Sequence, residues 1–379
     1  MEHPHIRFQD DLTKRSILFE NPSELIFVEK PHQIQDAFSK LEKVRQQGKW
    51  TAGFVAYEAG FSFEEKLRDK ITRFRDTPLF CFGIFDEPKE HPYPSLPQSL
   101  DGLADFLSGF QPCCDYSTYK ASFNSLREHI AKGDCYQGNL TFPIDGQWTG
   151  STTDLFDALS ARQPVRYGAH VALCEPLILS RSPELFFKVD RNGWIETHPM
   201  KGTAPRRSDP EADLREIELL KSSTKTQAEN VMIVDLLRND ISRVTDPFSL
   251  HVPKLFEVES YPSVHQMISC IRAKLNRDVT VGEIFRALFP CGSITGAPKL
   301  RVMEILNQLE PEPRGIYCGA IGYIGPGNQM LFNVAIRTLA LFNDGTARLN
   351  VGGGIVWDSV ARDEYDEALL KAKFVTGNG

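Results

Sequence analysis

The sequence lacks the excess of positive charge that binding to phosphate backbones requires. Its 43 Lys and Arg residues face 50 Asp and Glu residues, which gives a net charge of -7 at pH 7, so nucleic acid is a poor candidate partner. No apolar run approaches the ~20 residues that cross a bilayer, and the first residues lack the apolar core of a signal peptide. We therefore expect a cytoplasmic protein.

Cysteine patterns of the kind that bind zinc or form disulfide frameworks are also missing. The chain has eight cysteines with no CxxC pair and no Cys/His spacing of the zinc type, and only Cys113 and Cys114 are adjacent. Reduced, mostly buried thiols are the expected state. A phosphate-binding P-loop is absent as well, because Gly292 and Gly296 do not have the GxxxxGK[ST] spacing.

What the sequence does have is enough apolar material for a large core. Hydrophobic residues make up 41% of its 379 positions and charged residues 25%, which excludes a disordered chain. Prolines crowd residues 86–114, so we predict a linker there. It separates a small α+β region at residues 1–85 from a larger domain at residues 115–375.

Strand-like and helix-like runs mix without strict alternation after residue 115. This mixture predicts an α+β fold with antiparallel sheets rather than a doubly wound parallel sheet. Three helix starts carry capping signals. Asp209 precedes a proline, Thr224 has capping-box spacing to Gln227, and Asp358 or Ser359 can cap the last helix.

Carboxylates on two predicted helices form one candidate site. Glu364 and Glu367 lie three residues apart, on one helix face, where like charges repel. A solvated helix face explains such a pair, and a cation held between them is the alternative. Glu229 adjoins an apolar stretch of another helix. Carboxylates with no His or Cys partner suit Mg²⁺.

Two glycine-rich segments offer places for an anionic ligand. In GSITGAPK, Pro298 is expected in the first helical turn, so the N–H groups near Gly296 and Ala297 would face the positive helix end. The segment VGGGIVWDS follows a strand, and its glycines permit close approach of a ligand. An ordinary helix entry and a bulged turn are the simpler interpretations.

Lys201 and Glu184 are candidates for reactive groups. Lys201 follows a predicted strand; it is either a surface lysine or, if desolvated, an amine nucleophile with a lowered pKa. Glu184 begins a Phe-rich strand, where burial would raise its pKa and suit it to general acid catalysis. A carboxylate at a strand edge is the alternative.

Seven segments then occur in an order that is not generic. They closely resemble signature segments of the chorismate-utilising enzymes, a family that includes anthranilate, aminodeoxychorismate, isochorismate and salicylate synthases. The resemblance covers residues 115 to 375 and implies a fold of two packed antiparallel β-sheets flanked by helices, as in anthranilate synthase. The segments are SPELFF, MKGTAPR, AENVMIVDLLRNDISRV, CGSITGAPKLRVMEIL, YCGAIGYIG, FNVAIRT and GGGIVWDSVARDEYDEALLKA.

The resemblance implies a role for each matching residue. Glu229, Glu364 and Glu367 match the Mg²⁺ site that holds the ring carboxylate of chorismate. Glu184 matches the acid that protonates the hydroxyl leaving ring carbon 4, and His265 matches a histidine beside that carbon. The matching substrate contacts are Ser293, Tyr317, Arg337, Gly352, Gly353 and Gly354.

Lys201 distinguishes between branches of the family. Anthranilate synthases resemble PIAGT at this motif, aminodeoxychorismate synthases resemble PIKGT, and this chain has PMKGT. The resemblance thus implies amination of chorismate at ring carbon 4. An anthranilate synthase and a non-catalytic subunit that binds chorismate are the alternatives.

The sequence contains no glutaminase signature of the form GxCxGxQ. We therefore expect ammonia to come from a separate glutamine amidotransferase subunit or from solution. Pyruvate elimination from the product is expected to need another protein.

Overall fold

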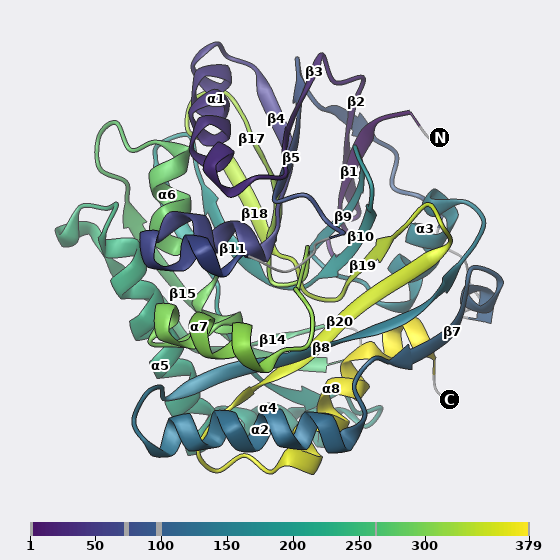
Figure 1. Ribbon diagram of the computed structural model, residues 1–379, viewed down its shortest axis with the longest axis vertical. Helices are drawn as coiled ribbons and strands as arrows, with labels where there is room; N and C mark the ends of the chain where they lie inside the picture. Colours follow the sequence, from purple (N-terminus) through teal and green to yellow (C-terminus); the bar gives the residue numbers. More distant parts are fainter. Residues whose placement is uncertain (1–2, 72–75, 96–100, 262–263, 378–379) are drawn as a thin grey trace.

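Two ten-stranded sheets form the frame of the protein, and every strand pair in them is antiparallel. The structure is a computed structural model that describes residues 3–71, 76–95, 101–261 and 264–377. The expected α+β fold of packed antiparallel sheets with helices outside is confirmed (Figure 1).

The first sheet has the strand order β16-β8-β20-β19-β10-β9-β1-β2-β6, and β7 also pairs with β8. Its strands are β1 (His5–Asp10), β2 (Arg15–Glu20), β6 (Lys89–His91), β7 (Leu107–Pro112), β8 (Gln137–Trp148), β9 (Tyr167–Ala172), β10 (Leu177–Ser182), β16 (Gly296–Ala297), β19 (Thr338–Leu341) and β20 (Thr346–Ile355).

The second sheet has the order β13-β15-β12-β11-β18-β17-β4-β5-β3, and β14 also pairs with β15. Its strands are β3 (Glu24–Val28), β4 (Trp50–Val55), β5 (Phe80–Phe85), β11 (Leu185–Val189), β12 (Trp194–Thr197), β13 (Met200–Pro205), β14 (His251–Ser260), β15 (Val264–Lys274), β17 (Ala320–Ile324) and β18 (Met330–Val334).

Eight α-helices within the described residues cover these sheets. They are α1 (Ile34–Gln46), α2 (Tyr116–Ala131), α3 (Thr152–Arg162), α4 (Pro210–Ser222), α5 (Thr224–Ser242), α6 (Val281–Leu288), α7 (Lys299–Leu309) and α8 (Ala361–Thr376). Short 3₁₀ turns lie at Pro31–Gln33, Tyr57–Phe63, Glu65–Lys70, Asp101–Asp105, Pro247–Ser249 and Gly292–Ile294.

Three large apolar clusters hold the layers together. Residues of β1, β4, β5 and β9, such as Phe8, Phe54 and Val171, pack between the two sheets. A second cluster joins α1, α5 and α6 to the second sheet, and a third joins α2, α3, α7 and α8 to the first sheet. In Figure 1, α2 and α8 lie below β8 and β20, and α1 and α6 lie beside the second sheet. Burial of apolar surface in these layers supplies the main stabilisation.

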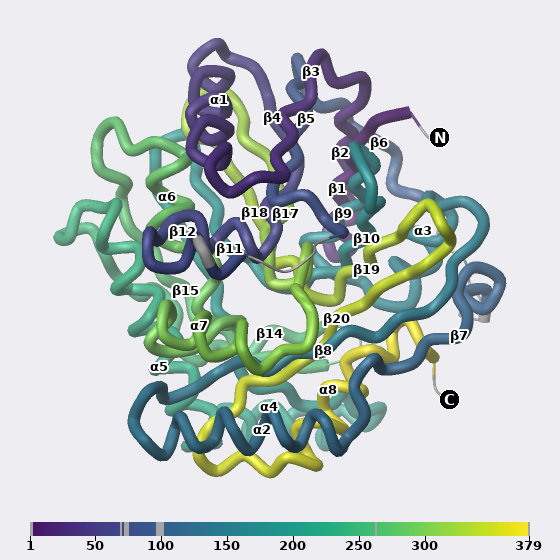
Figure 2. Tube along the Cα trace, viewed as in Figure 1, coloured from purple at the N-terminus to yellow at the C-terminus, as the bar shows by residue number. Residues whose placement is uncertain are grey.

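Strand pairing crosses the boundary that we predicted at residues 86–114. β1 pairs with β9 and β4 pairs with β17, so the described strands of residues 1–85 extend both sheets. The segment 86–114 itself contributes β6 and β7, and its residues 96–100 lie outside the described part. The tube in Figure 2 shows the purple N-terminal strands beside the teal and green strands of the later chain. The three-part division stays a prediction.

Helix starts agree with the sequence where the signal is strong. The Asp209 side chain accepts from the N–H of Ala212, as its position before a proline predicts. The prediction for α5 was wrong by one residue, because Ser223 caps it and Thr224 is the first helical residue. α8 has Val360 as its N-cap with no side-chain bond, since Ser359 instead donates to Glu364.

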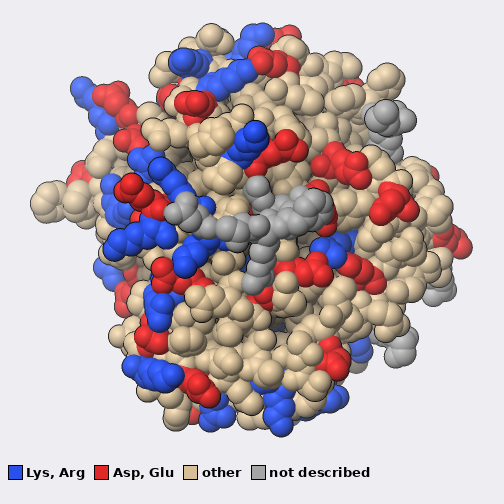
Figure 3. Space-filling model, in the orientation of Figure 1, with Lys and Arg blue, Asp and Glu red and all other residues tan. Residues whose placement is uncertain are grey.

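The distribution of surface charge and the state of the cysteines agree with what the composition indicates. No helix of the described residues is long and apolar enough to cross a membrane. All eight cysteines are free thiols. Basic and acidic side chains are interspersed over the face shown in Figure 3, with no broad area of one sign.

Candidate active site

Glu184 lies where the chain crosses from the first sheet to the second, between β10 and β11. Its side chain is buried, and Ser293 Oγ donates to its Oε1 over 2.7 Å. Burial raises the pKa of Glu184 to about 7, and the Ser293 bond and the charges of Lys201 and Arg337 oppose this shift. A carboxyl group of this pKa can be protonated at neutral pH and act as an acid.

Lys201 enters the same region from β13, where the register with β15 is irregular between Met200 and Thr203. Burial lowers the pKa of the Lys201 amine, and the ammonium of Lys371 lowers it further. The carboxylates of Glu229, Glu184 and Glu367 oppose the shift. The charges of Glu184 and Lys201 thus act on one another, so the acid and the amine belong to one electrostatically linked group.

The glycines of β20 form one wall of this space. Gly352, Gly353 and Gly354 pair with β8 along a regular ladder, so the bulged turn is excluded. A Cβ on Gly354 would lie 3.4 Å from Lys201 Nζ, and a Cβ on Gly353 would lie 3.0 Å from Glu364 Oε2. Without side chains here, the amine and the carboxylate approach the strand closely.

Helix α8 supplies the two predicted carboxylates. Glu364 accepts from Ser359 Oγ over 2.7 Å, and burial together with the charge of Glu367 raises its pKa. Glu367 pairs with Lys371 over 2.9 Å. Lys371 Nζ also donates to the Gly352 carbonyl over 2.9 Å. The half-buried Glu364 carboxylate therefore lies close to the glycines of β20, whereas the Glu367 side chain remains 59% exposed beside Lys371.

This donor set fits a hard divalent cation. Glu229 on α5 acts electrostatically on Lys201, which brings the third predicted carboxylate to the same space. The ligand oxygens of Glu229, Glu364 and Glu367 do not all lie within 4.8 Å of one another among the described residues. The three carboxylates therefore do not form one preformed ligand set, and Mg²⁺ stays a prediction; an ion that typically takes one or two carboxylates and keeps several waters would not need all three as direct ligands.

Ser293 is held by a buried ion pair beneath its loop. Arg314 donates to Glu310 Oε2 over 2.9 Å and to the Ile294 carbonyl over 3.0 Å. It also donates to the Asn139 carbonyl of β8 over 2.6 Å. The loop that carries Ser293 is thereby fixed to the strand that pairs with the glycines.

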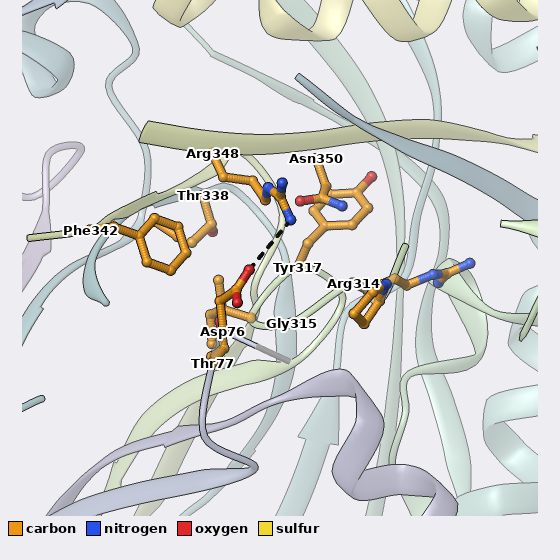
Figure 4. A pocket seen from close by; sticks show the side chains of 12 residues that line it. Asp76, Thr77, Arg314, Gly315, Tyr317, Thr338, Phe342, Arg348 and Asn350 are labelled. Atoms are coloured by element: carbon orange, nitrogen blue, oxygen red, sulfur yellow. Dashed lines mark ion pairs between the residues drawn. The ribbon is translucent and has the colours of Figure 1, made fainter. Parts of the chain in front are cut away.

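Arg337 interacts electrostatically with both Glu184 and Tyr317. Arg337 has a left-handed φ of 51°, and burial lowers its pKa while the charge of Glu184 opposes this. The amide of Gln163 faces its guanidinium, at 3.1 Å from Nε. Tyr317 is buried and also lines a small pocket with Arg348 and Asp76, whose ion pair is drawn in Figure 4.

His265 is placed differently from the other predicted residues. Its Nε2 lies 2.9 Å from Asp213 Oδ1 on α4, and its Nδ1 lies 2.8 Å from Ser260 Oγ on β14. Both ring nitrogens are therefore within hydrogen-bond distance of polar side chains of α4 and β14. Its role beside ring carbon 4 stays a prediction without support from these contacts.

The loop GSITGAPK also differs from its predicted form. Gly296 and Ala297 form β16, which pairs with β8, and Pro298 is the N-cap of α7 rather than a residue of its first turn. The predicted place of Pro298 is therefore wrong by one residue, and an anion site at this helix start stays a prediction. What the loop contributes is the hydroxyl of Ser293.

Two residues of the site were missed by sequence reasoning. Lys371 follows Glu367 by four residues, a spacing that favours an ion pair on a helix. Gln137 on β8 is buried, and its Nε2 has no hydrogen-bond partner among the described residues. A Cβ on Gly354 would lie 2.7 Å from that nitrogen. A single amide in a strand gives no sequence signal, so only the pairing of β8 with β20 identifies Gln137.

Comparisons with known proteins agree with this arrangement. The family described as chorismate binding enzyme matches residues 8–377. The chain is 43% identical over 276 residues to aminodeoxychorismate synthase component 1 of Escherichia coli (strain K12), covering 72% of this chain and 60% of that protein. It is 39% identical over 248 residues to anthranilate synthase component 1 of Streptomyces coelicolor, covering 65% of this chain and 48% of that protein.

Coverage of the relatives is partial. The corresponding protein of Klebsiella aerogenes is 43% identical over 253 residues, which cover 67% of this chain and 56% of that protein. The chain thus spans little more than half the length of the two aminodeoxychorismate synthase components that it matches.

Solved structures share the fold over almost the whole chain. Anthranilate synthase component I from Streptococcus pneumoniae TIGR4 superposes with a TM-score of 0.80 and 28% identity, covering 96% of this chain and 92% of that one. The menaquinone-specific isochorismate synthase of Escherichia coli gives a TM-score of 0.75 at 18% identity, covering 99% and 88%. With acid, amine, carboxylates and glycines in one space and the family match along the chain, the protein belongs to the chorismate binding enzymes.

Proposed function

We propose that the chain is an aminodeoxychorismate synthase component I, which converts chorismate and ammonia to 4-amino-4-deoxychorismate. This product is the precursor of p-aminobenzoate in folate synthesis. The observation that carries the proposal is Lys201, whose amine has a lowered pKa and interacts electrostatically with the buried acid Glu184. The 43% identity to proteins of that name supports it.

The chemistry consists of two allylic displacements. The neutral amine of Lys201 attacks ring carbon 2, the two conjugated ring double bonds shift, and the C4–O bond breaks as Glu184 gives its proton to the departing hydroxyl. Ammonia then attacks carbon 4, both double bonds shift back, the C2–N bond to Lys201 breaks, and the proton released by the new amine can return to Glu184. Overall, the hydroxyl group on carbon 4 of chorismate leaves as water and an amino group takes its place, with no change of oxidation state.

The surrounding residues bind and orient the substrate. Arg337 offers a planar guanidinium for bidentate pairing with the enolpyruvyl carboxylate, and Tyr317 and Ser293 supply hydroxyl groups. The glycines Gly352 to Gly354 let the ring lie against β20. Glu229, Glu364 and Glu367 would hold Mg²⁺, which when bound supplies positive charge for the ring carboxylate.

Ammonia delivery is the remaining part of the proposal. We infer that a separate glutamine amidotransferase subunit provides it in the cytoplasm, because the sequence has no glutaminase signature. The name component 1 of the relatives is consistent with a protein that acts with a partner.

An anthranilate synthase is the second candidate, favoured by the solved structure with a TM-score of 0.80. That reaction places ammonia directly at carbon 2 and needs no lysine nucleophile, so Lys201 counts against it. A non-catalytic chorismate-binding subunit is disfavoured, because the acid, the amine and the carboxylates are all present in one space.

Substitution of Lys201 tests the proposal directly. Lys201→Ala is expected to lose most formation of 4-amino-4-deoxychorismate and to shift some product toward carbon 2. Lys201→Arg keeps the charge but not a free amine, so it is expected to be equally inactive for the carbon 4 product. A Lys201→Arg enzyme that makes the normal product at a normal rate, measured by product mass, would contradict covalent catalysis.

A further inference from the structure

A second group of potential metal ligands lies outside the active site. Among the described residues, Glu196, His198 and Cys270 form the one group of three acidic, histidine or cysteine side chains whose ligand atoms all lie within 4.8 Å of one another. His198 Nε2 is 2.6 Å from Glu196 Oε1. Cys270 is buried, whereas Glu196 and His198 remain partly exposed. The group is therefore preformed and can be reached from solvent.

Strand geometry explains why these three side chains meet. Glu196 and His198 are two residues apart at the end of β12, so they point to the same side of the sheet. β12 pairs with β15 in the register Thr197 to Ile271, which places His198 opposite Cys270. Ile195 and Ile271 face the apolar core, so the three ligands share the opposite face.

The donor types point to a different metal from that of the active site. Thiolate, imidazole and carboxylate together suit Zn²⁺ and its analogues, whereas Mg²⁺ prefers oxygen alone. Lys188 Nζ lies 3.0 Å from Glu196 Oε1, so a cation bound here would displace a weak, partly exposed ion pair. The bond between His198 and Glu196 would give way to bonds from both residues to the metal.

We propose that Glu196, His198 and Cys270 bind one thiophilic divalent cation of the Zn²⁺ class, with water as the fourth ligand. On binding, the Cys270 thiol loses its proton to solvent. His198 is followed after two residues by Lys201, so metal binding would also restrain the segment that leads into β13.

Binding of Zn²⁺ and Co²⁺ to the full chain tests this proposal. The experiment is made in excess Mg²⁺, which occupies oxygen-only sites. We expect one equivalent of Zn²⁺, and a thiolate-to-metal absorption band with Co²⁺. Cys270→Ser is expected to abolish the band and to weaken Zn²⁺ binding by at least about tenfold. The matched control is Cys113→Ser, which removes an exposed thiol elsewhere and should bind as the parent does.

A second variant keeps the test decisive if Cys270→Ser does not fold. His198→Asn changes a partly exposed side chain, and it too should weaken Zn²⁺ binding by at least about tenfold without changing the far-ultraviolet circular dichroism. The proposal is overturned if the parent binds no Zn²⁺, if the Co²⁺ band disappears in Cys113→Ser, or if a folded His198→Asn chain binds as tightly as the parent.

Discussion

Glu184 makes the stability of the protein depend on pH in an unusual direction. Its pKa is about 7 in the folded chain and near 4.5 without burial, so the folded state holds its proton more tightly than the unfolded state. The stability that this carboxyl contributes is full at low pH and is lost as the pH rises from 4.5 through 7.

Glu184→Gln removes this pH dependence. The variant should be inactive, yet its stability relative to the parent, measured as the free energy required for unfolding, should be about 2 kcal/mol greater at pH 8 than at pH 5. Urea unfolding of both proteins at the two pH values measures the difference. An equal difference at pH 5 and pH 8 would show that the carboxyl is not titrating in this range.

We expect substitution of Glu367 to change the dependence of turnover on Mg²⁺ most clearly. Glu367→Gln neutralises one of the predicted Mg²⁺ ligands. Turnover at ordinary Mg²⁺ concentrations should therefore fall by about tenfold or more, as expected when a metal site loses a ligand. The matched control is Asp366→Asn on the same helix, which pairs with Arg362 at the surface. Near-normal activity of Glu367→Gln across a Mg²⁺ titration would refute the metal assignment.

At the scale of elements, strand β20 contributes to the site through its backbone rather than through side chains. Gly354→Ala would place a methyl group 2.7 Å from Gln137 Nε2 and 3.4 Å from Lys201 Nζ. Its φ is not in the left-handed region, so the fold should persist while kcat/KM falls by about tenfold or more. Gly102→Ala is the control, since a Cβ there has open space. Equal kcat/KM values for both variants would show that this wall does not touch the reacting groups.

Local signals in the sequence predicted single elements well. The Asp209 cap depends on a side chain and a backbone N–H three residues away, so the sequence alone contains the interaction. The predicted cap of α8 was wrong because the Ser359 hydroxyl donates to Glu364 instead of capping the helix. That bond depends on how α8 lies against β20. Competition between a cap and a tertiary contact cannot be read from spacing.

At the scale of the whole molecule, the antiparallel class could be predicted but not the order of the strands. β8 and β20 are more than 190 positions apart in the sequence and form a ten-residue ladder. Neither strand sequence contains a feature that identifies the other as its pairing partner, so the sequence could not place Gln137 beside Gly354. The residues of the family motifs were predictable, whereas the contacts of His265 with Asp213 and Ser260 depend on how α4 and β14 pack against β15 and carry no signal in the sequence.

The source of nitrogen is a property of the whole chain. Without a glutaminase signature, the isolated chain should form product with ammonium at raised pH and none with glutamine. Addition of a glutamine amidotransferase subunit that acts with a relative of this chain should allow glutamine to serve as the nitrogen source. Turnover of the pure chain with glutamine as its sole nitrogen source would contradict the proposed division of labour.

The most direct test of the account is the identity of the product. The chain is incubated with chorismate, Mg²⁺ and ammonium, and the product is analysed by mass and by the position of its amino group. We predict an amine at ring carbon 4 with the enolpyruvyl group retained. Anthranilate or another product aminated at carbon 2, formed at a comparable rate, would contradict the assignment of Lys201 and with it the proposed function.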